Sequence, residues 1–134
     1  MQWILADIIQ RMNLREELAR VVKGDVSDDL KLRTQYSRDT SIFERAPKVV
    51  VFPKDADDVA AVVKYVKSAK ERGEDVSIAP RSAGTDMTGG VLTDSISLVF
   101  TKYMNRIIAV NENDAVTEPG VYYRDFEKET VRKV

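Results

Sequence analysis

The sequence predicts an α+β (mixed α/β) fold, because a parallel βαβ unit is followed by antiparallel strands. Residues 49–52 form a short apolar run, residues 55–69 have helical periodicity, and residues 76–79 form a second apolar run. A strand, a helix and a strand within about thirty residues are typical of a βαβ unit with parallel strands and a right-handed crossover. Farther along, residues 107–110 and 115–118 flank a polar turn, which predicts a β-hairpin.

Residues 1–45 are predicted to form a helical segment at the N-terminus. Apolar residues recur at helical spacing over residues 3–22, and Gly24 supplies a stop. This pattern fits one helix or two short helices broken near Asn13. The polar residues 27–29 are a candidate helix cap.

The first elements of residues 46–134 are predicted from clear local patterns in the sequence. The run at residues 49–52 is mostly β-branched and is followed by Pro53, which suits a strand buried on both faces. Asp55 is predicted to cap the next helix, and Gly73 stands where a left-handed residue ends a helix. The apolar positions of this helix form one predicted stripe, made up of Val59, Val62, Val63, Val66 and Ala69.

Three further elements complete the expected fold. The apolar run at residues 76–79 is predicted to end at a proline, Pro80, as the first run ends at Pro53. Residues 95–100 are predicted to form a strand, and the charged residues 122–133 a terminal helix.

Composition excludes several classes of site. The chain has 134 residues, of which 43% are hydrophobic and 32% charged, as in an ordinary soluble globular protein. Its 21 basic and 22 acidic residues give a net charge of −1, which does not indicate a nucleic-acid partner. Without cysteine or histidine the chain has no disulfide, thiolate nucleophile, Cys/His metal site or histidine triad.

No run of residues has the length of a transmembrane segment, and the N-terminus lacks the basic start and long apolar stretch of a signal peptide. We therefore expect a cytoplasmic location, with peripheral association at the inner face of the membrane as the alternative.

Residues 80–90 form a loop of small residues that suits an anion. Glycines let successive N–H groups converge on a phosphate oxygen, hydroxyls add donors, and an arginine adds a cation. A passive polar connection fits this composition equally well. The loop follows a predicted parallel strand, however, and ligands gather at the carboxyl ends of such strands. The residues concerned are Arg81, Ser82, Gly84, Thr85, Thr88, Gly89 and Gly90.

Four separated motifs resemble one family in their order along the chain. They are Ala-Pro-Lys-Val-Val-Val-Phe-Pro-Lys at 46–54, the loop at 81–90, Lys-Tyr-Met-Asn-Arg-Ile at 102–107 and Glu-Pro-Gly-Val at 118–121. Together they resemble the FAD-binding domain of the FAD-linked oxidase superfamily, the type found in vanillyl-alcohol oxidase and p-cresol methylhydroxylase (PCMH). With Tyr-Ser-Arg-Asp at 36–39, they are most similar to the D-lactate dehydrogenase and glycolate oxidase subunit branch.

The resemblance implies that residues 46–134 are the N-terminal part of a PCMH-type domain that binds FAD. The implied diphosphate contacts are backbone amides of Arg81, Ser82, Ala83, Gly84 and Thr85, continued by Asp86, Thr88, Gly89 and Gly90. Pro53 would border the adenosine half, and Pro119, Gly120 and Val121 would form a second wall. Family loops commonly have glycine where Ser82 stands. Branches that attach flavin covalently through this loop have histidine where Thr85 stands, so the implied binding is non-covalent.

Alternative roles for these residues stay open. Each glycine could serve only as a turn residue, and Pro53 and Pro119 could act only as strand ends. Arg81 could pair with a carboxylate such as Asp86 or Glu118 instead of a phosphate.

The resemblance also implies a function for a longer protein. It would be a flavin-dependent oxidoreductase that oxidises a D-2-hydroxy acid such as lactate or glycolate, with catalytic residues outside this chain. A homo-oligomer or a separate electron-acceptor subunit is a candidate partner. The alternative is a truncated stand-alone module that has lost flavin binding and acts as a structural or interaction subunit.

Overall fold

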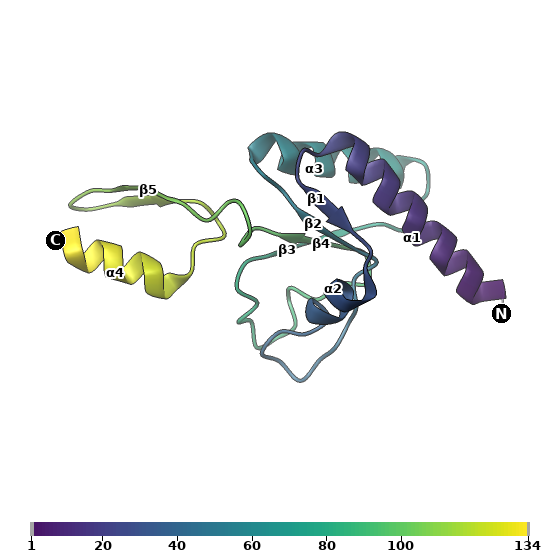
Figure 1. Ribbon diagram of the computed structural model, residues 1–134, viewed down its shortest axis with the longest axis horizontal. Coiled ribbons are helices and arrows are strands. Elements are labelled where there is room, and N and C mark those ends of the chain that lie inside the picture. Colours follow the sequence, from purple (N-terminus) through teal and green to yellow (C-terminus); the bar gives the residue numbers. More distant parts are fainter. Residues whose placement is uncertain (1, 134) are drawn as a thin grey trace.

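A computed structural model describes residues 2–133 and contains a four-stranded mixed sheet and a separate two-stranded sheet (Figure 1). The predicted α+β class is confirmed. In chain order the elements are α1 (Gln2–Val21), β1 (Asp25–Ser27), α2 (Leu30–Gln35), β2 (Val49–Phe52), α3 (Ala56–Glu71), β3 (Ile78–Arg81), β4 (Ile96–Val99), β5 (Ile107–Val110), β6 (Ala115–Thr117) and α4 (Tyr123–Lys133).

The larger sheet has the strand order β1-β2-β4-β3. Strand β4 is parallel to both β2 and β3, whereas β1 pairs with β2 antiparallel. All four residues of β2 and all four of β4 are buried, as expected for central strands covered on both faces. The carboxyl ends of β2, β3 and β4 therefore lie at one edge of the sheet.

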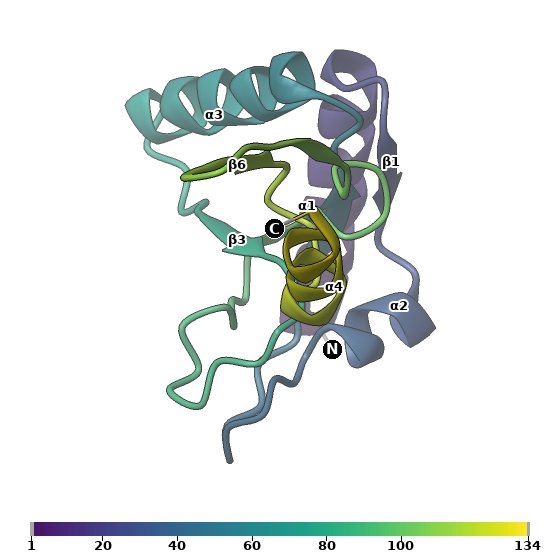
Figure 2. The same ribbon diagram turned by 90° about the vertical axis from the view of Figure 1, so that its left-hand side faces the viewer.

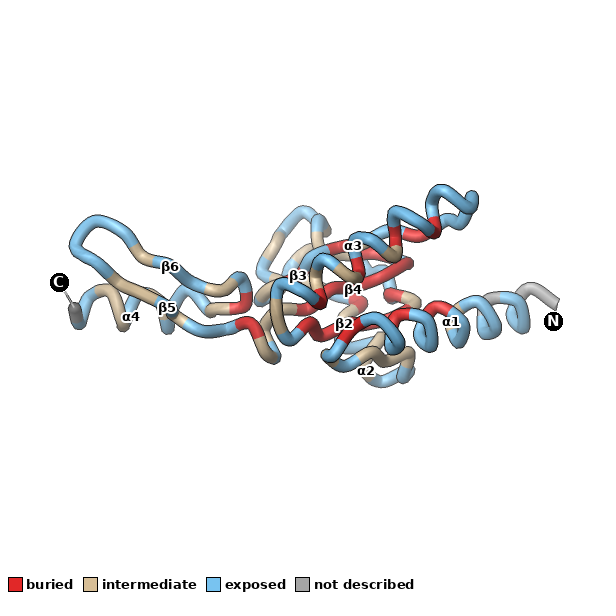
Figure 3. Tube along the Cα trace, turned by 90° about the horizontal axis from the view of Figure 1, so that it is seen from above, coloured by how far each residue is buried: buried red, intermediate tan, exposed pale blue. Residues whose placement is uncertain are grey.

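Helices cover the two faces of this sheet unequally. Helices α1 and α3 cover one face, while α2 lies on the other (Figure 2). Buried positions concentrate where these layers meet, and the first half of α1 extends beyond them (Figure 3). The main core is formed by Leu14, Leu18, Val22, Val49, Val51, Val62, Val66, Ala69, Val76, Ile96 and Leu98, and the smaller one by Val50, Phe52 and Val99.

Local signals in the sequence locate most elements correctly. The N-terminal helix is continuous through Asn13, and Asp29 caps α2 by accepting from the Leu32 N–H group. Asp55 caps α3, and Gly73 follows it with a φ of 83°. The predicted hairpin and terminal helix are confirmed as β5, β6 and α4.

The predicted parallel orientation of β2 and β3 is confirmed, with β4 lying between them. Two other expectations about packing are wrong. Pro80 does not end its strand; it pairs in register with Leu98 within β3. This is tolerated because β3 is an edge strand, where a missing N–H faces no partner. Val63 is 52% exposed and lies outside the buried stripe of α3.

The hairpin and α4 project away from the larger sheet (Figures 1 and 3). Their connection is fixed at Gly120, whose N–H group donates to the Met104 carbonyl oxygen at 2.8 Å. A Cβ atom at Gly120 would overlap the Phe100 carbonyl oxygen, so only glycine allows this close approach.

Among the residues described, no helix combines the length and apolar character needed to cross a membrane. The same part of the chain holds no cluster of three or more carboxylates arranged to bind a metal ion.

A buried carboxylate, Asp58, joins three backbone segments. It is 1% exposed and accepts hydrogen bonds from the N–H groups of Lys23 at 2.8 Å, Gly24 at 3.0 Å and Lys54 at 2.9 Å. A Cβ atom at Gly24 would overlap the Phe52 carbonyl oxygen, so this turn can approach β2 only with glycine. Asp58 therefore links the end of α1, the end of β2 and the first turn of α3.

We expect Asp58→Ala to lower the free energy of unfolding by roughly 3 kcal/mol, because it strands buried N–H donors. Urea unfolding followed by circular dichroism measures this. Asp57→Ala is the matched control, since the neighbouring Asp57 side chain is 87% exposed, and it should cost less than about 1 kcal/mol. Equal losses for the two variants would contradict the role given to Asp58.

Candidate functional site

The predicted anion loop leaves β3 at the carboxyl edge of the parallel strands. Residues 82–92 are irregular in structure, and Gly84 and Gly89 have positive φ angles of 69° and 81°. Left-handed backbone favours glycine, so both glycines are required by the path of the chain. The turn after β4 and the end of β2 lie at the same edge.

In the first half of the loop, residues 82–85, the backbone N–H groups are hydrogen-bond donors without a partner in the described residues. Within residues 2–133, no hydrogen-bond acceptor is found for the backbone N–H groups of Ser82, Ala83, Gly84 and Thr85. Ala83 and Thr85 are exposed, and Ser82 and Gly84 are half-buried. These donors are therefore available to an anion from solvent.

A buried cation lies beneath this first half. Arg81 is 7% exposed, and its guanidinium group donates to the backbone carbonyl oxygens of Tyr36 at 3.3 Å and Arg38 at 2.7 Å. It also lies 5.2 Å from the centre of the Tyr36 ring. A Cβ atom at Gly84 would overlap Nη2 of Arg81, so the Gly84 backbone rests directly on the guanidinium group.

The proposed carboxylate partners of Arg81 are wrong. Glu118 pairs with Arg106 at 2.7 Å, and the Asp86 carboxylate bonds to its own loop. Burial lowers the pKa of Arg81, with Tyr36 and Asp39 opposing that shift, but a guanidinium stays charged in proteins. Since the guanidinium group of Arg81 donates to backbone carbonyl oxygens, its contribution to the loop is a buried positive charge.

In the second half of the loop, residues 86–90, the Asp86 side chain accepts hydrogen bonds from two later residues of the same loop. Asp86 accepts from the N–H and hydroxyl groups of Thr88 at 2.9 and 2.8 Å, and from the Gly90 N–H group at 2.8 Å. These hydrogen bonds, led by the one from the Thr88 amide, lower the pKa of Asp86. The implied diphosphate contacts at Thr88 and Gly90 are thus already occupied by a carboxylate.

Residues 36–43 support the loop from the side, and only their first part was singled out from the sequence. The Thr40 hydroxyl donates to the Asp86 carbonyl oxygen at 2.9 Å. A Cβ atom at Gly89 would lie 3.1 Å from the Phe43 ring, which packs against this glycine. Residues 36–39 carried a family resemblance, but no local pattern marks Thr40 or Phe43 as loop contacts, because these contacts span more than forty residues of chain.

The remaining predicted residues have different surroundings. Pro53 is fully buried, which favours its role as a strand end over a cofactor contact. Pro119 is exposed, Gly120 is buried and Val121 is half-buried, and these residues lie against the turn after β4.

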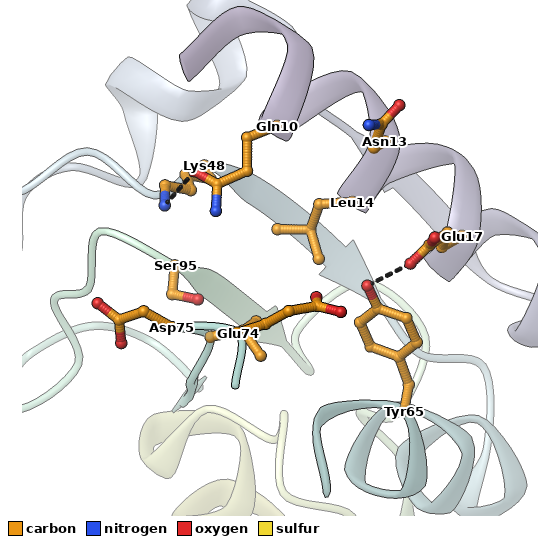
Figure 4. A pocket seen from close by; sticks show the side chains of 10 residues that line it. Gln10, Asn13, Leu14, Glu17, Lys48, Tyr65, Glu74, Asp75 and Ser95 are labelled. Carbon is orange, nitrogen blue, oxygen red and sulfur yellow. Dashed lines mark hydrogen bonds between the residues drawn. The ribbon is translucent and has the colours of Figure 1, made fainter. Parts of the chain in front are cut away.

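A separate cavity of about 260 Å³ lies at the opposite edge of the sheet, between α1, the end of α3 and the amino ends of the parallel strands (Figure 4). There the Tyr65 hydroxyl donates to Glu17 at 2.6 Å, and burial followed by that carboxylate raises the pKa of Tyr65. The Lys48 ammonium donates to the Gln10 side chain at 3.2 Å. No residue of the anion loop lines this cavity.

Comparison with known proteins gives consistent matches. A family described as "FAD binding domain" matches residues 47–134. The D-2-hydroxyglutarate dehydrogenase of Pseudomonas putida is 39% identical over 89 residues, which are 66% of this chain and 9% of that protein. The D-2-hydroxyglutarate dehydrogenase of Escherichia coli is 33% identical over 104 residues, 77% of this chain and 10% of that protein.

Solved structures agree on the fold. The structure of p-cresol methylhydroxylase with bound substrate superimposes with a TM-score of 0.68 at 19% identity, covering 96% of this chain and 25% of that chain. This chain therefore spans about a tenth of the two dehydrogenases and a quarter of the oxidoreductase structure it resembles.

Alanine substitutions at two glycines test the contact between the loop and Arg81. Gly73 and Gly84 both have positive φ, but a Cβ atom at Gly73 meets open space while one at Gly84 meets the guanidinium group. We expect Gly73→Ala to cost about 1 kcal/mol of unfolding free energy and Gly84→Ala at least about 1 kcal/mol more. Urea denaturation measures both; equal costs would contradict the contact.

Proposed function

The chain belongs to the FAD binding domain family, and we propose that it is the FAD-binding portion of a flavin-dependent dehydrogenase. The observation that carries the proposal is the set of unpaired amides at residues 82–85 above the buried charge of Arg81. Convergent N–H donors next to a cation suit a phosphate group.

The loop fits the diphosphate of FAD in its first half. Gly84 brings the backbone close to an approaching oxygen, and the exposed Thr85 and half-buried Ser82 add hydroxyl groups at the same surface. Bound FAD supplies the hydride acceptor, while this chain binds and orients the nucleotide part. Because Thr85 stands where the resemblance places the histidine of covalently flavinylated branches, we propose non-covalent binding through this loop.

We further propose that the longer protein oxidises a D-2-hydroxy acid. The support is the similarity to two proteins named D-2-hydroxyglutarate dehydrogenase. Lactate or glycolate as the substrate, a cytoplasmic location, a homo-oligomer and an electron-acceptor subunit stay predictions from the sequence. No catalytic residue is assigned to this chain.

Flavin binding by the chain tests the proposal. We expect the purified protein to quench the fluorescence of added FAD and to retain flavin absorbance through gel filtration. Gly84→Val should weaken binding by about tenfold or more, because a branched side chain at Gly84 displaces the guanidinium group and fills the cradle.

Gly73→Val is the matched control, since Gly73 has the same left-handed backbone at the far end of α3 and open space around it. It should bind FAD within about twofold of the wild type. A folded wild-type chain that retains no flavin absorbance after incubation with FAD and gel filtration would contradict the proposal. It would favour the structural or interaction module instead. Equal loss in both variants would contradict the assignment of the site to Gly84.

A further inference from the structure

We propose that Asp86 is an internal anion that occupies the Thr88 and Gly90 amides and confines the cofactor's diphosphate to residues 82–85. The inference rests on the proposed function, and it assigns Asp86 as a positioning residue that sets where along the loop a phosphate binds. The family resemblance alone treats residues 81–90 as one continuous contact surface.

The Asp86 carboxylate pairs with donors of its own loop. Asp86 takes the N–H groups of Thr88 and Gly90 and the Thr88 hydroxyl, at distances of 2.8 to 2.9 Å. Backbone N–H groups that converge in this way are the donors with which glycine loops hold phosphate. A carboxylate is itself a strong acceptor for them, so Asp86 occupies the place of a phosphate oxygen.

Position 90 is glycine for a steric reason. A Cβ atom at Gly90 would overlap Oδ2 of Asp86, so the missing side chain leaves room for this carboxylate. By contrast, the missing side chain of Gly84 leaves room for the Arg81 guanidinium group. The two glycines therefore accommodate opposite charges.

Charge also distinguishes the two halves of the loop. Among the described residues, Asp86 forms no ion pair that would neutralise it, and its backbone is held in place by the Thr40 hydroxyl. A phosphate on the Thr88 and Gly90 amides would have to displace a like charge. A phosphate on residues 82–85 meets unpaired amides above Arg81 instead.

The test compares anion binding by the wild type and by Asp86→Asn. The substitution keeps an oxygen that can accept from Thr88 and removes the negative charge. We expect inorganic pyrophosphate to bind about fivefold to tenfold more tightly, because the second half of the loop then accepts an anion. Adenosine, which belongs to the nucleotide part of FAD but has no phosphate, should bind unchanged. Isothermal titration calorimetry measures both ligands.

Asp75→Asn is the charge-matched control. Asp75 is exposed and lines the cavity at the opposite edge of the sheet, so the variant has the same net charge without altering the loop. It should bind pyrophosphate within about twofold of the wild type, since screening weakens exposed charges at such distances. If Asp86→Asn unfolds the loop, Asp86→Ser provides a second uncharged acceptor and should change pyrophosphate affinity in the same direction.

The outcomes separate the two proposals. Unchanged or weaker pyrophosphate binding in both Asp86 variants, with FAD still bound by the wild type, would overturn the role of Asp86 alone. A wild-type chain that binds neither FAD nor pyrophosphate would overturn the proposed function and this inference together. If Asp75→Asn also binds pyrophosphate more tightly, the gain in affinity comes from the change in net charge. That result would overturn the inference as well.

Discussion

The arrangement of the sheet and of its carboxyl edge depends on one buried carboxylate, Asp58. Its side chain accepts hydrogen bonds from the N–H groups of Lys23, Gly24 and Lys54. These backbone donors lie in turns, where no helix or strand partner accepts from them. Lys54 lies two residues after the end of β2, so its hydrogen bond to Asp58 holds the end of that strand against the first turn of α3. The carboxyl edge from which the anion loop arises is therefore fixed by a polar group inside an apolar core.

At several positions of this chain, steric contacts explain why the residue is glycine. Gly24 lies against the Phe52 carbonyl oxygen, Gly84 against the Arg81 guanidinium group and Gly120 against the Phe100 carbonyl oxygen. In each case the backbone approaches another group more closely than a Cβ atom permits. A loop rich in glycine is thus a packed structure here, and its free donors are those that packing leaves unpaired.

Sequence patterns predicted the parts of the fold that depend on neighbouring residues. The Asp55 cap, the stop at Gly73, the buried run at β2 and the β5–β6 hairpin are all local features. The position of β4 between β2 and β3 depends on pairing between distant segments, as does the contact of Arg81 with Tyr36 and Arg38. Composition predicted an anion loop at residues 80–90, but only the hydrogen bonds of the structure distinguish its two halves.

That division explains how a chain with a net charge of −1 can present a site for an anion. Net charge acts over the whole surface and is screened within about 10 Å at ordinary salt concentrations. A bound phosphate instead responds to the donors and charges that it touches. At residues 82–85 these are unpaired amides above a buried guanidinium, while Asp86 turns residues 86–90 into a region that repels a second anion. In the proposed site, the alternation of the two charges along one loop would give a bound diphosphate a defined position.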